Sequence, residues 1–412
     1  MRGNCCERKK LLQSWRLFPG VPSGKSGQGT QDPFVASQPE PESRGQRQLK
    51  FEDAGPSMIR TVTKHQAHPS LQRQERQRTP LPGDLFTRDQ ATIHFERAEN
   101  LYARWPTPIC IISDGPYGVS GFPGDNHKAE SLAGWYEPHI KAWSKFSTPE
   151  TTLWFWNTEV GWATVHPVLA ANGWEYRCCN IWDKGLGHVA GNANTQTLRK
   201  FPVVTEVCVH YVKAATFQVC NQSLTMQEWL REEWRRTGLP FRLANEACGL
   251  LNAATRKYLT ADHLWYYPPV DAFVKLAEYA NKHGNPAGKP YFSTDASRPI
   301  SGESWARLRA KFHCDVGVTN VWREPQVSGS ERIQGKRNGM KYKFSSLHGS
   351  QKPLKFVELA IRACTDEGDV VWEPFGGLCP GAVVSYHFRR RYHGSEIIPE
   401  FYAAAVERLA TS

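Results

Sequence analysis

The chain has 412 residues, of which 40% are apolar, so it is long enough to build one large globular domain or two of ordinary size. No run of about 18 apolar residues is present, and residues 1–15 lack the apolar stretch of a secretory signal, so the sequence predicts no membrane partner and a cytoplasmic protein. The 11 cysteines are scattered without a CxxC pair, which predicts free thiols and no metal site.

The formal charge of +11 is concentrated in two segments. Residues 1–80 contain 14 Lys or Arg against 7 Asp or Glu and are rich in Gln, Pro, Ser and Gly, so residues 1–82 are predicted to be a basic, disordered extension. A misplaced start upstream of Met58 would account for this segment equally well. Residues 214–345 contain 19 Lys or Arg against 12 Asp or Glu, and such an excess in folded protein indicates a polyanionic partner.

From residue 84 onward, short apolar runs alternate with helix-like segments. Strands are predicted at residues 109–112, 152–156 and 203–209, and helices at residues 135–143 and 162–171. This alternation predicts an α/β fold in which a mostly parallel sheet carries helices on both faces. We assign residues 83–213 and 317–412 to the two halves of this domain, separated by a helical region at residues 214–316.

The helical region contains helix-turn-helix spacing at residues 243–259. Gly249 suits the tight turn, and a second helix predicted over residues 254–259 carries Arg256 and Lys257 near its start. An ordinary helical hairpin would use the same small residues. In the first interpretation, Arg256 and Lys257 reach base edges or phosphates of DNA.

The apolar run 109–112 ends in Ser-Asp-Gly-Pro-Tyr-Gly, with Asp114 and Tyr117 at the carboxyl edge of the predicted sheet, where open α/β sheets bind ligands. A plain loop would use the same turn residues. The chemical alternative is activation of an aryl amine, whose lone pair is delocalised into its ring. A carboxylate and a backbone carbonyl that accept the amino hydrogens would localise the lone pair, while an aromatic ring stacks on the extruded base. Direct displacement on a sulfonium methyl group then needs no metal.

A second pattern lies near the carboxyl end. A buried strand at residues 370–372 is followed by Glu-Pro-Phe-Gly-Gly at residues 373–377, a helix over about residues 381–391, and a strand ending at Glu396. A strand, a glycine turn, a helix and an acid about 20 residues on are typical of sites for adenosine-containing cofactors. The glycines allow close approach of the backbone, and the acid accepts the ribose hydroxyls. Upstream, Pro353 suits the start of a helix whose polar entry would face the same cofactor edge.

Over residues 84–409 these segments together resemble the amino-methylating DNA methyltransferases. The order of the motifs resembles the permuted beta class, in which the catalytic motif precedes the target-recognition region and the cofactor motifs come last. Residues 114–117 are similar to the catalytic Asp-Pro-Pro-Tyr, residues 348–353 to His-x-x-Gln-Lys-Pro, residues 373–377 to Asp-Pro-Phe-x-Gly, and residues 396–400 to Glu-x-x-Pro-Glu. Residues 182–184 and 202–213, with Glu206 in the latter, resemble the intervening strands of the family.

The resemblance implies a Rossmann-like methyltransferase sheet with a helical target-recognition insert, S-adenosylmethionine as cofactor, and methyl transfer to adenine N6 in double-stranded DNA by base flipping. The catalytic residues would be Asp114, Gly115, Pro116 and Tyr117, and the cofactor residues Gln351, Lys352, Pro353, Glu373, Pro374, Phe375, Gly376, Gly377 and Glu396. The residues that contact DNA would be Arg256, Lys257, Arg332, Lys336 and Arg337.

Two departures from the family pattern concern the loops of the site. Gly115 replaces the first proline, whose backbone carbonyl the family uses, and Cys379 and Pro380 stand where the family usually has a glycine and a threonine. The aspartate at the head of the motif favours adenine N6 over cytosine N4, because the cytosine enzymes more often carry Ser or Thr there.

Other functions remain open at the level of sequence. A catalytically inactive DNA-binding relative would keep the fold and the basic helical region, and an RNA methyltransferase would also use the abundant aromatic residues, which include 15 Trp. The helix-turn-helix spacing favours duplex DNA over RNA. A companion restriction endonuclease and the oligomeric state are left open.

Overall fold

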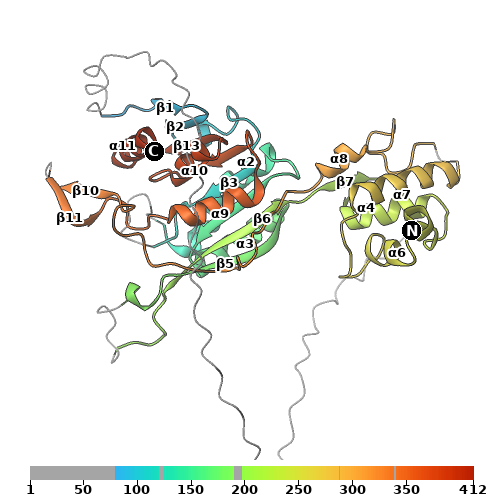
Figure 1. Ribbon diagram of the computed structural model, residues 1–412, viewed down its shortest axis with the longest axis horizontal. Coiled ribbons are helices and arrows are strands. Elements are labelled where there is room, and N and C mark those ends of the chain that lie inside the picture. Colours follow the sequence, from blue (N-terminus) through green and yellow to red (C-terminus); the bar gives the residue numbers. More distant parts are fainter. Residues whose placement is uncertain (1–78, 120–124, 126, 190–196, 287, 338–339) are drawn as a thin grey trace, which may run out of the picture. The chain divides into compact units, whose positions relative to one another are not determined.

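The computed structural model describes residues 79–119, 125, 127–189, 197–286, 288–337 and 340–412 (Figure 1). Most of the predicted basic extension, residues 1–82, therefore lies outside the described residues. Within the described part of the chain, no helix combines the length and the apolar character needed to cross a membrane.

A nine-stranded mixed sheet forms the α/β region, and its strands lie in the order β1-β2-β13-β12-β3-β4-β6-β5-β9. The neighbouring strands from β2 to β4 are parallel, whereas β1 and β6 run antiparallel to their neighbours. The bounds are β1 Leu85–Arg88, β2 Ala91–Phe95, β3 Cys110–Ser113, β4 Thr152–Asn157, β5 Trp174–Asp183, β6 Thr205–Lys213, β9 Val321–Arg323, β12 Val370–Glu373 and β13 Arg391–Glu396. The predicted α/β sheet is confirmed, with β6 as an antiparallel strand in its interior.

Helices cover both faces of this sheet. Three of them, α9 (Leu354–Cys364), α10 (Pro380–His387) and α11 (Pro399–Thr411), share a core with Ile112 and Trp154, while α2 (Leu132–Phe146) and α3 (Glu159–Ala171) share another with Ile111 and Leu153. Consecutive residues join opposite cores because side chains alternate across a strand. Since both faces are covered, every residue of β3 and β4 is buried, which explains their uninterrupted apolar runs.

The connections of the sheet diverge at the neighbouring strands β3 and β12. The chain leaves β3 through α2 toward β4 on one side, and it leaves β12 through α10 toward β13 on the other. At such a switch point the carboxyl ends of the two strands border a crevice, which is where open α/β sheets bind ligands. Asp114 directly follows β3 and Pro374 directly follows β12, so both sequence motifs start at this crevice.

The region between β6 and β9 has an aromatic core of its own. Phe273 and Trp305 stack there with their ring centroids 3.9 Å apart, and Trp229 packs beside them. The elements are β7 Thr216–Val219, β8 Gln222–Thr225, α4 Met226–Arg236, α5 Leu243–Cys248, α6 Ala253–Lys257, α7 Val270–His283 and α8 Gly302–Ala306. Apart from a short hairpin at its start, the regular elements of this region are helices.

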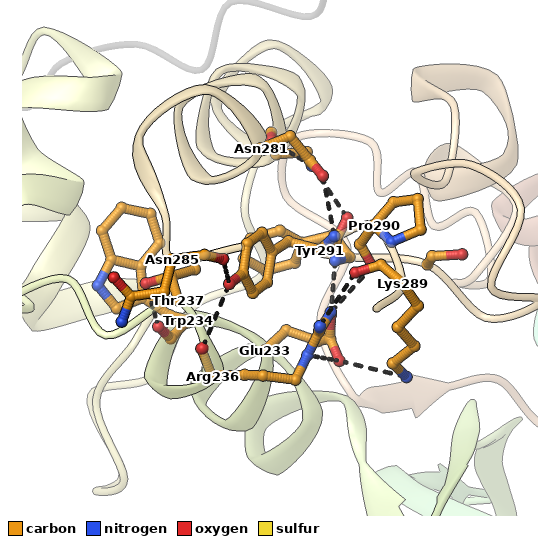
Figure 2. Close-up of polar contacts among 12 residues, drawn as sticks. Glu233, Trp234, Arg236, Thr237, Asn281, Asn285, Lys289, Pro290 and Tyr291 are labelled. Carbon is orange, nitrogen blue, oxygen red and sulfur yellow. Dashed lines mark hydrogen bonds and ion pairs between the residues drawn. The ribbon is translucent and has the colours of Figure 1, made fainter. Parts of the chain in front are cut away.

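A buried carboxylate fastens the chain after α7 to helix α4 (Figure 2). Glu233, on α4, is 2% exposed and accepts bonds from Arg236 at 2.7 Å and from the amide of Phe292 at 2.6 Å. Lys289 lies 3.8 Å from its other oxygen, and Arg236 also donates to the carbonyls of Lys289 and Pro290. Each oxygen of Glu233 is therefore paired, and the cluster joins two segments of the helical region.

Two short helices, α5 and α6, lie in the segment with helix-turn-helix spacing, and α6 is shorter than its sequence predicts. Gly249 occupies the turn after α5, and α6 contains only five residues, Ala253–Lys257. The amide of Leu259 donates a hydrogen bond to the carbonyl of Ala254, five residues earlier. This turn follows the end of the helix at Lys257. The prediction that Arg256 and Lys257 lie near the start of this helix is therefore wrong, since both occupy its last turn.

Candidate active site

A cavity of about 210 Å³ opens at the crevice beyond the carboxyl ends of β3 and β12. Five segments that are distant in the chain surround it: residues 97–99, 114–117, 348–352, 374–378 and 395–398. Trp135 and His139 of α2 also line the wall. The predicted catalytic motif and the predicted cofactor motifs thus line one cavity.

Asp114 is bonded to the described protein through one of its two carboxylate oxygens. Its Oδ1 accepts a hydrogen bond from Tyr117 Oη at 2.8 Å and lies 2.9 Å from Lys352 Nζ. Among the described residues none donates to Oδ2. Burial, followed by the charges of Asp114 and Glu206, raises the pKa of Tyr117, so its phenol is a hydrogen-bond donor at neutral pH. A fixed carboxylate therefore has one oxygen available to a ligand in the cavity.

Lys352, predicted to contact the cofactor, is only 2% exposed and lies between two carboxylates. Besides Asp114, its Nζ lies 3.3 Å from Glu206 Oε2, and the other oxygen of Glu206 is paired with Lys184. Burial alone would lower the pKa of Lys352, but the charges of Asp114 and Glu206 raise it above its usual value. Burial would raise the pKa of Glu206, yet Lys352 and Lys184 lower it. Asp114, Lys352, Glu206 and Lys184 are therefore connected by a series of ion pairs at this end of the cavity.

Packing explains the glycine in the catalytic loop. A Cβ atom at Gly115 would lie 2.6 Å from Tyr136 Oη and 2.7 Å from a ring carbon of Phe375, closer than real Cβ contacts. The next carbonyl, that of Pro116, accepts hydrogen bonds from Tyr136 Oη and Asn157 Nδ2, each at 3.1 Å. Gly115 stands where the family has its first proline. The hydrogen bonds of Tyr136 and Asn157 to the Pro116 carbonyl hold the loop in place without that proline.

Asp125 is a loop-ordering residue that the sequence did not single out. It is 7% exposed, and its carboxylate accepts hydrogen bonds from the amides of Tyr117 at 2.8 Å, Gly118 at 3.2 Å and Val119 at 3.1 Å. Three charge-assisted bonds to consecutive amides fix the backbone that carries Tyr117.

The other end of the cavity is formed by the glycine turn after β12 and by the end of β13. Gly377 has a φ of +54°, a left-handed conformation that glycine adopts without strain, and its amide donates to Glu396 Oε2 at 2.7 Å. The other oxygen of Glu396 accepts from the amides of Ile397 and Ile398. Burial raises the pKa of Glu396 to about 7. Pro374, Phe375 and Gly376 line the same part of the cavity, as their motif predicts.

Glu373 lies outside the cavity wall, although the resemblance assigned it to the cofactor. It is 1% exposed, accepts a hydrogen bond from Tyr392 Oη at 2.6 Å, and accepts another from the amide of Gly381 at 3.1 Å. Burial raises its pKa to about 8, so Glu373 is largely protonated at neutral pH. Its contacts join β12 to β13 and to the start of α10.

Gln351 and Pro353 hold the segment that precedes α9. Gln351 borders the cavity, but its amide group accepts from the amide of Ile333 at 3.0 Å and donates to the carbonyl of Glu331 at 2.7 Å. Pro353 stands at the N-cap of α9 and is not part of the cavity wall. Both residues therefore position the backbone on either side of Lys352.

The residues predicted to contact DNA lie on separate segments. Arg256 and Lys257 are exposed on α6, and Arg332 is partly exposed. Lys336 and Arg337 belong to β10 (Gln334–Arg337), which pairs with β11 (Met340–Ser346), and their side chains are outside the described part of the chain. Arg256, Lys257 and Arg332 do not line the cavity.

Aromatic residues that belong to none of the sequence motifs also line the cavity. The ring of His139 lies 4.6 Å from Trp135 and 5.0 Å from Phe375, measured between centroids. Burial lowers the pKa of His139 to about 4, so its ring is neutral, and its Nδ1 is bonded to Tyr102 Oη at 2.9 Å. The sequence predicted a helix over residues 135–143, but nothing in it indicates which helix borders a cavity.

The fold and the site agree with a match to a known protein family. Residues 109–407 match the family N6_N4_Mtase, described as DNA methylase. Because the match covers well over half of the chain, the protein belongs to this family of DNA methylases.

Two curated relatives and one solved structure illustrate the similarity. The orphan methyltransferase M.BamHII of Bacillus amyloliquefaciens is 30% identical over 135 residues, which are 32% of this chain and 47% of that protein. The Type II methyltransferase M2.MboI of Moraxella bovis is 30% identical over 94 residues, 23% of this chain and 30% of that protein. The chain thus spans less than half the length of these relatives. The crystal structure of the M1.HpyAVI-SAM complex superimposes with a TM-score of 0.40 and 14% identity, covering 77% of this chain and 98% of that one.

Proposed function

We propose that this DNA methylase transfers a methyl group from S-adenosylmethionine to the N6 amino group of adenine in double-stranded DNA. The observation that carries the proposal is the state of Asp114. One of its oxygens is held by Tyr117 and Lys352, and the described residues leave the other without a donor at the cavity.

The chemistry requires an acceptor of this kind. The lone pair of an aryl amine is delocalised into the ring, and hydrogen bonds from its amino hydrogens to Asp114 and to the carbonyl of Gly115 would localise it on nitrogen. Tyr117, whose backbone is fixed by Asp125, would support the extruded base. These residues orient the base and increase its nucleophilicity.

The opposite end of the cavity fits the adenosyl part of the cofactor. The left-handed turn at Gly377 lets the ligand approach the backbone, and the carboxylate of Glu396 is placed by three amides to accept ribose hydroxyls. When bound there, S-adenosylmethionine supplies the electrophilic methyl group. Because Glu373 is buried and bonded to Tyr392 and Gly381, we assign it to the support of the turn and not to contact with the cofactor.

Recognition of the DNA sequence is assigned to residues 214–316. This region has a core of its own, carries exposed Arg256 and Lys257, and lies between the two chain segments that build the sheet. The motif order, with Asp114 before this region and Glu396 after it, supports assignment to the permuted class.

The test is methylation of DNA by the purified chain with isotopically labelled S-adenosylmethionine, followed by mass spectrometry of the nucleosides. N6-methyladenine in DNA, and its loss in Asp114→Ala, are the expected results. N4-methylcytosine as the sole product would contradict the adenine assignment and leave the methyltransferase assignment intact. Binding of cofactor and DNA without transfer would identify the inactive DNA-binding relative instead.

A further inference from the structure

Four charged side chains form a continuous line beside the cavity: Lys184, Glu206, Lys352 and Asp114. Lys184, Glu206 and Lys352 are 7%, 8% and 2% exposed at their side chains, and Asp114 is 18% exposed. Opposite charges alternate along the line, so its formal charge is zero. Ionised groups remain charged in such a buried position only when each is paired.

Lys352 has no hydrogen left for a cofactor. An ammonium group carries three donors. Its Nζ lies 2.9 Å from Asp114 Oδ1, 3.3 Å from Glu206 Oε2 and 2.9 Å from the carbonyl of Ser350, so each donor has an acceptor. The rings of Tyr117 and Trp156 lie 5.1 and 5.5 Å from the same atom. Three acceptors and two aromatic rings of the protein therefore surround the ammonium group of Lys352.

We infer that Lys352 and Glu206 are positioning residues for Asp114, and that Lys184 supports them by pairing with the far oxygen of Glu206. The inference rests on the proposed function. Lys352 and Tyr117 together occupy Oδ1 of Asp114, which fixes the carboxylate and directs Oδ2 to the amino group of the base.

Glu206 has a separate role in this arrangement. Lys352 shares its charge between two carboxylates, so Asp114 is polarised less than it would be by an ammonium group of its own. Tyr117 Oη also lies 3.3 Å from Glu206 Oε2, so the same carboxylate restrains both partners of Asp114. Without Glu206, Lys352 would pair with the carboxylate of Asp114 alone. The stronger interaction would make Asp114 a weaker hydrogen-bond acceptor for the base.

The experiment compares Lys352→Met, Glu206→Gln and Lys184→Met in the full chain. For each variant, single-turnover methylation, the Kd of S-adenosylmethionine and the thermal unfolding midpoint are measured. We expect the turnover rate to fall about 100-fold for Lys352→Met and about 10-fold for Glu206→Gln, with a smaller fall for Lys184→Met. The Kd of the cofactor should change less than about threefold in all three.

Glu233→Gln is the matched control, because Glu233 is also a buried carboxylate between Arg and Lys but belongs to the helical region. We expect it to lower the unfolding midpoint without changing the Kd of S-adenosylmethionine. If Lys352→Met does not fold, the nearly isosteric Glu206→Gln decides the matter.

Three results would overturn the inference. A large rise in the cofactor Kd of Lys352→Met with an unchanged rate would place Lys352 on the cofactor, and unchanged rates in both Lys352→Met and Glu206→Gln would show that the ion pairs are structural. Failure of the wild-type chain to methylate any DNA would instead refute the proposed function and, with it, the inference.

Discussion

Two buried clusters of ion pairs contain the same residue types but differ in their roles. One lies in the helical region and the other at the sheet edge. In the helical region, both oxygens of Glu233 are paired with Arg236, Lys289 and the amide of Phe292 (Figure 2). At the sheet edge, the described residues pair with Asp114 through Oδ1 alone, and Asp114 borders a cavity. Glu233, with both oxygens paired, holds two segments together, whereas Oδ2 of Asp114, to which no described residue donates, can act on a ligand in the cavity.

The largest effect expected from this comparison is on stability. Glu233→Ala leaves two basic side chains and the amide of Phe292 without their acceptor. Breaking a buried ion pair costs about 3–5 kcal/mol, and we expect the lower end because Arg236 and Lys289 are 24% and 39% exposed. Denaturant titration gives the free energy of unfolding. An unchanged value would mean that Glu233 does not hold this region together.

Asp114→Ala should show the opposite behaviour. The carboxylate acts on the target amine, so we expect kcat to fall at least about 100-fold, which corresponds to about 2.7 kcal/mol of transition-state stabilisation. The Kd of S-adenosylmethionine should stay nearly constant, and Asp366→Ala, which changes an exposed acid paired with Lys311, is the control. Near-normal turnover of Asp114→Ala would remove Asp114 from the catalytic site.

Sequence patterns predicted the elements that are defined locally. Helix α9, Leu354–Cys364, begins directly after Pro353, which the sequence analysis placed at the start of a helix. The helix predicted over residues 381–391 ends at His387, since the chain soon turns with a left-handed φ of +55° at Arg389, a residue with no local sign of a turn. The sequence predicted a mostly parallel sheet but did not identify β6 as antiparallel, because strand direction is set by long-range pairing.

The site was predictable as far as its motifs extend. Asp114 directly follows β3, Tyr117 and Gly377 lie in the loops after β3 and β12, and Glu396 is the last residue of β13. Parallel strands bring their carboxyl ends to one edge of the sheet. Pairings between motifs were not predictable. The contact of Lys352 with Asp114 joins segments at opposite ends of the domain, so no spacing rule assigns Lys352 to the carboxylate in preference to the cofactor.

A smaller effect is expected at Glu396, which is bonded to three amides but also borders the cavity. Glu396→Ala should weaken binding of S-adenosylmethionine by roughly 1.5–3 kcal/mol, the value of a lost charged hydrogen bond, while kcat at saturating cofactor stays near normal. Titration calorimetry measures the affinity. An unchanged affinity would exclude Glu396 from the cofactor site.

The same residue predicts a pH dependence of cofactor binding. Because burial raises the pKa of Glu396 to about 7, the free protein carries mostly the neutral acid below pH 7 and mostly the carboxylate above it. The carboxylate is the stronger acceptor for ribose hydroxyls, so the Kd should fall as the pH rises from about 6 to 8. Glu396→Gln, measured in parallel, separates this effect from titration of the cofactor itself, and an identical pH profile in both proteins would contradict the assignment.

The smallest expected effects concern Arg256 and Lys257, whose side chains are exposed on the last turn of a five-residue helix. A base contact and a phosphate contact have different signatures: loss of the first relaxes specificity at one position, whereas loss of the second weakens binding to all sequences and lowers the salt slope by about one. We expect Arg256→Ala to relax specificity and Lys257→Ala to lower the slope. DNA binding is measured across salt concentrations, together with sequencing of the methylated sites. If the double variant methylates the same sites with an unchanged salt slope, the charges of α6 take no part in recognition, and Arg332, Lys336 and Arg337 become the residues to test.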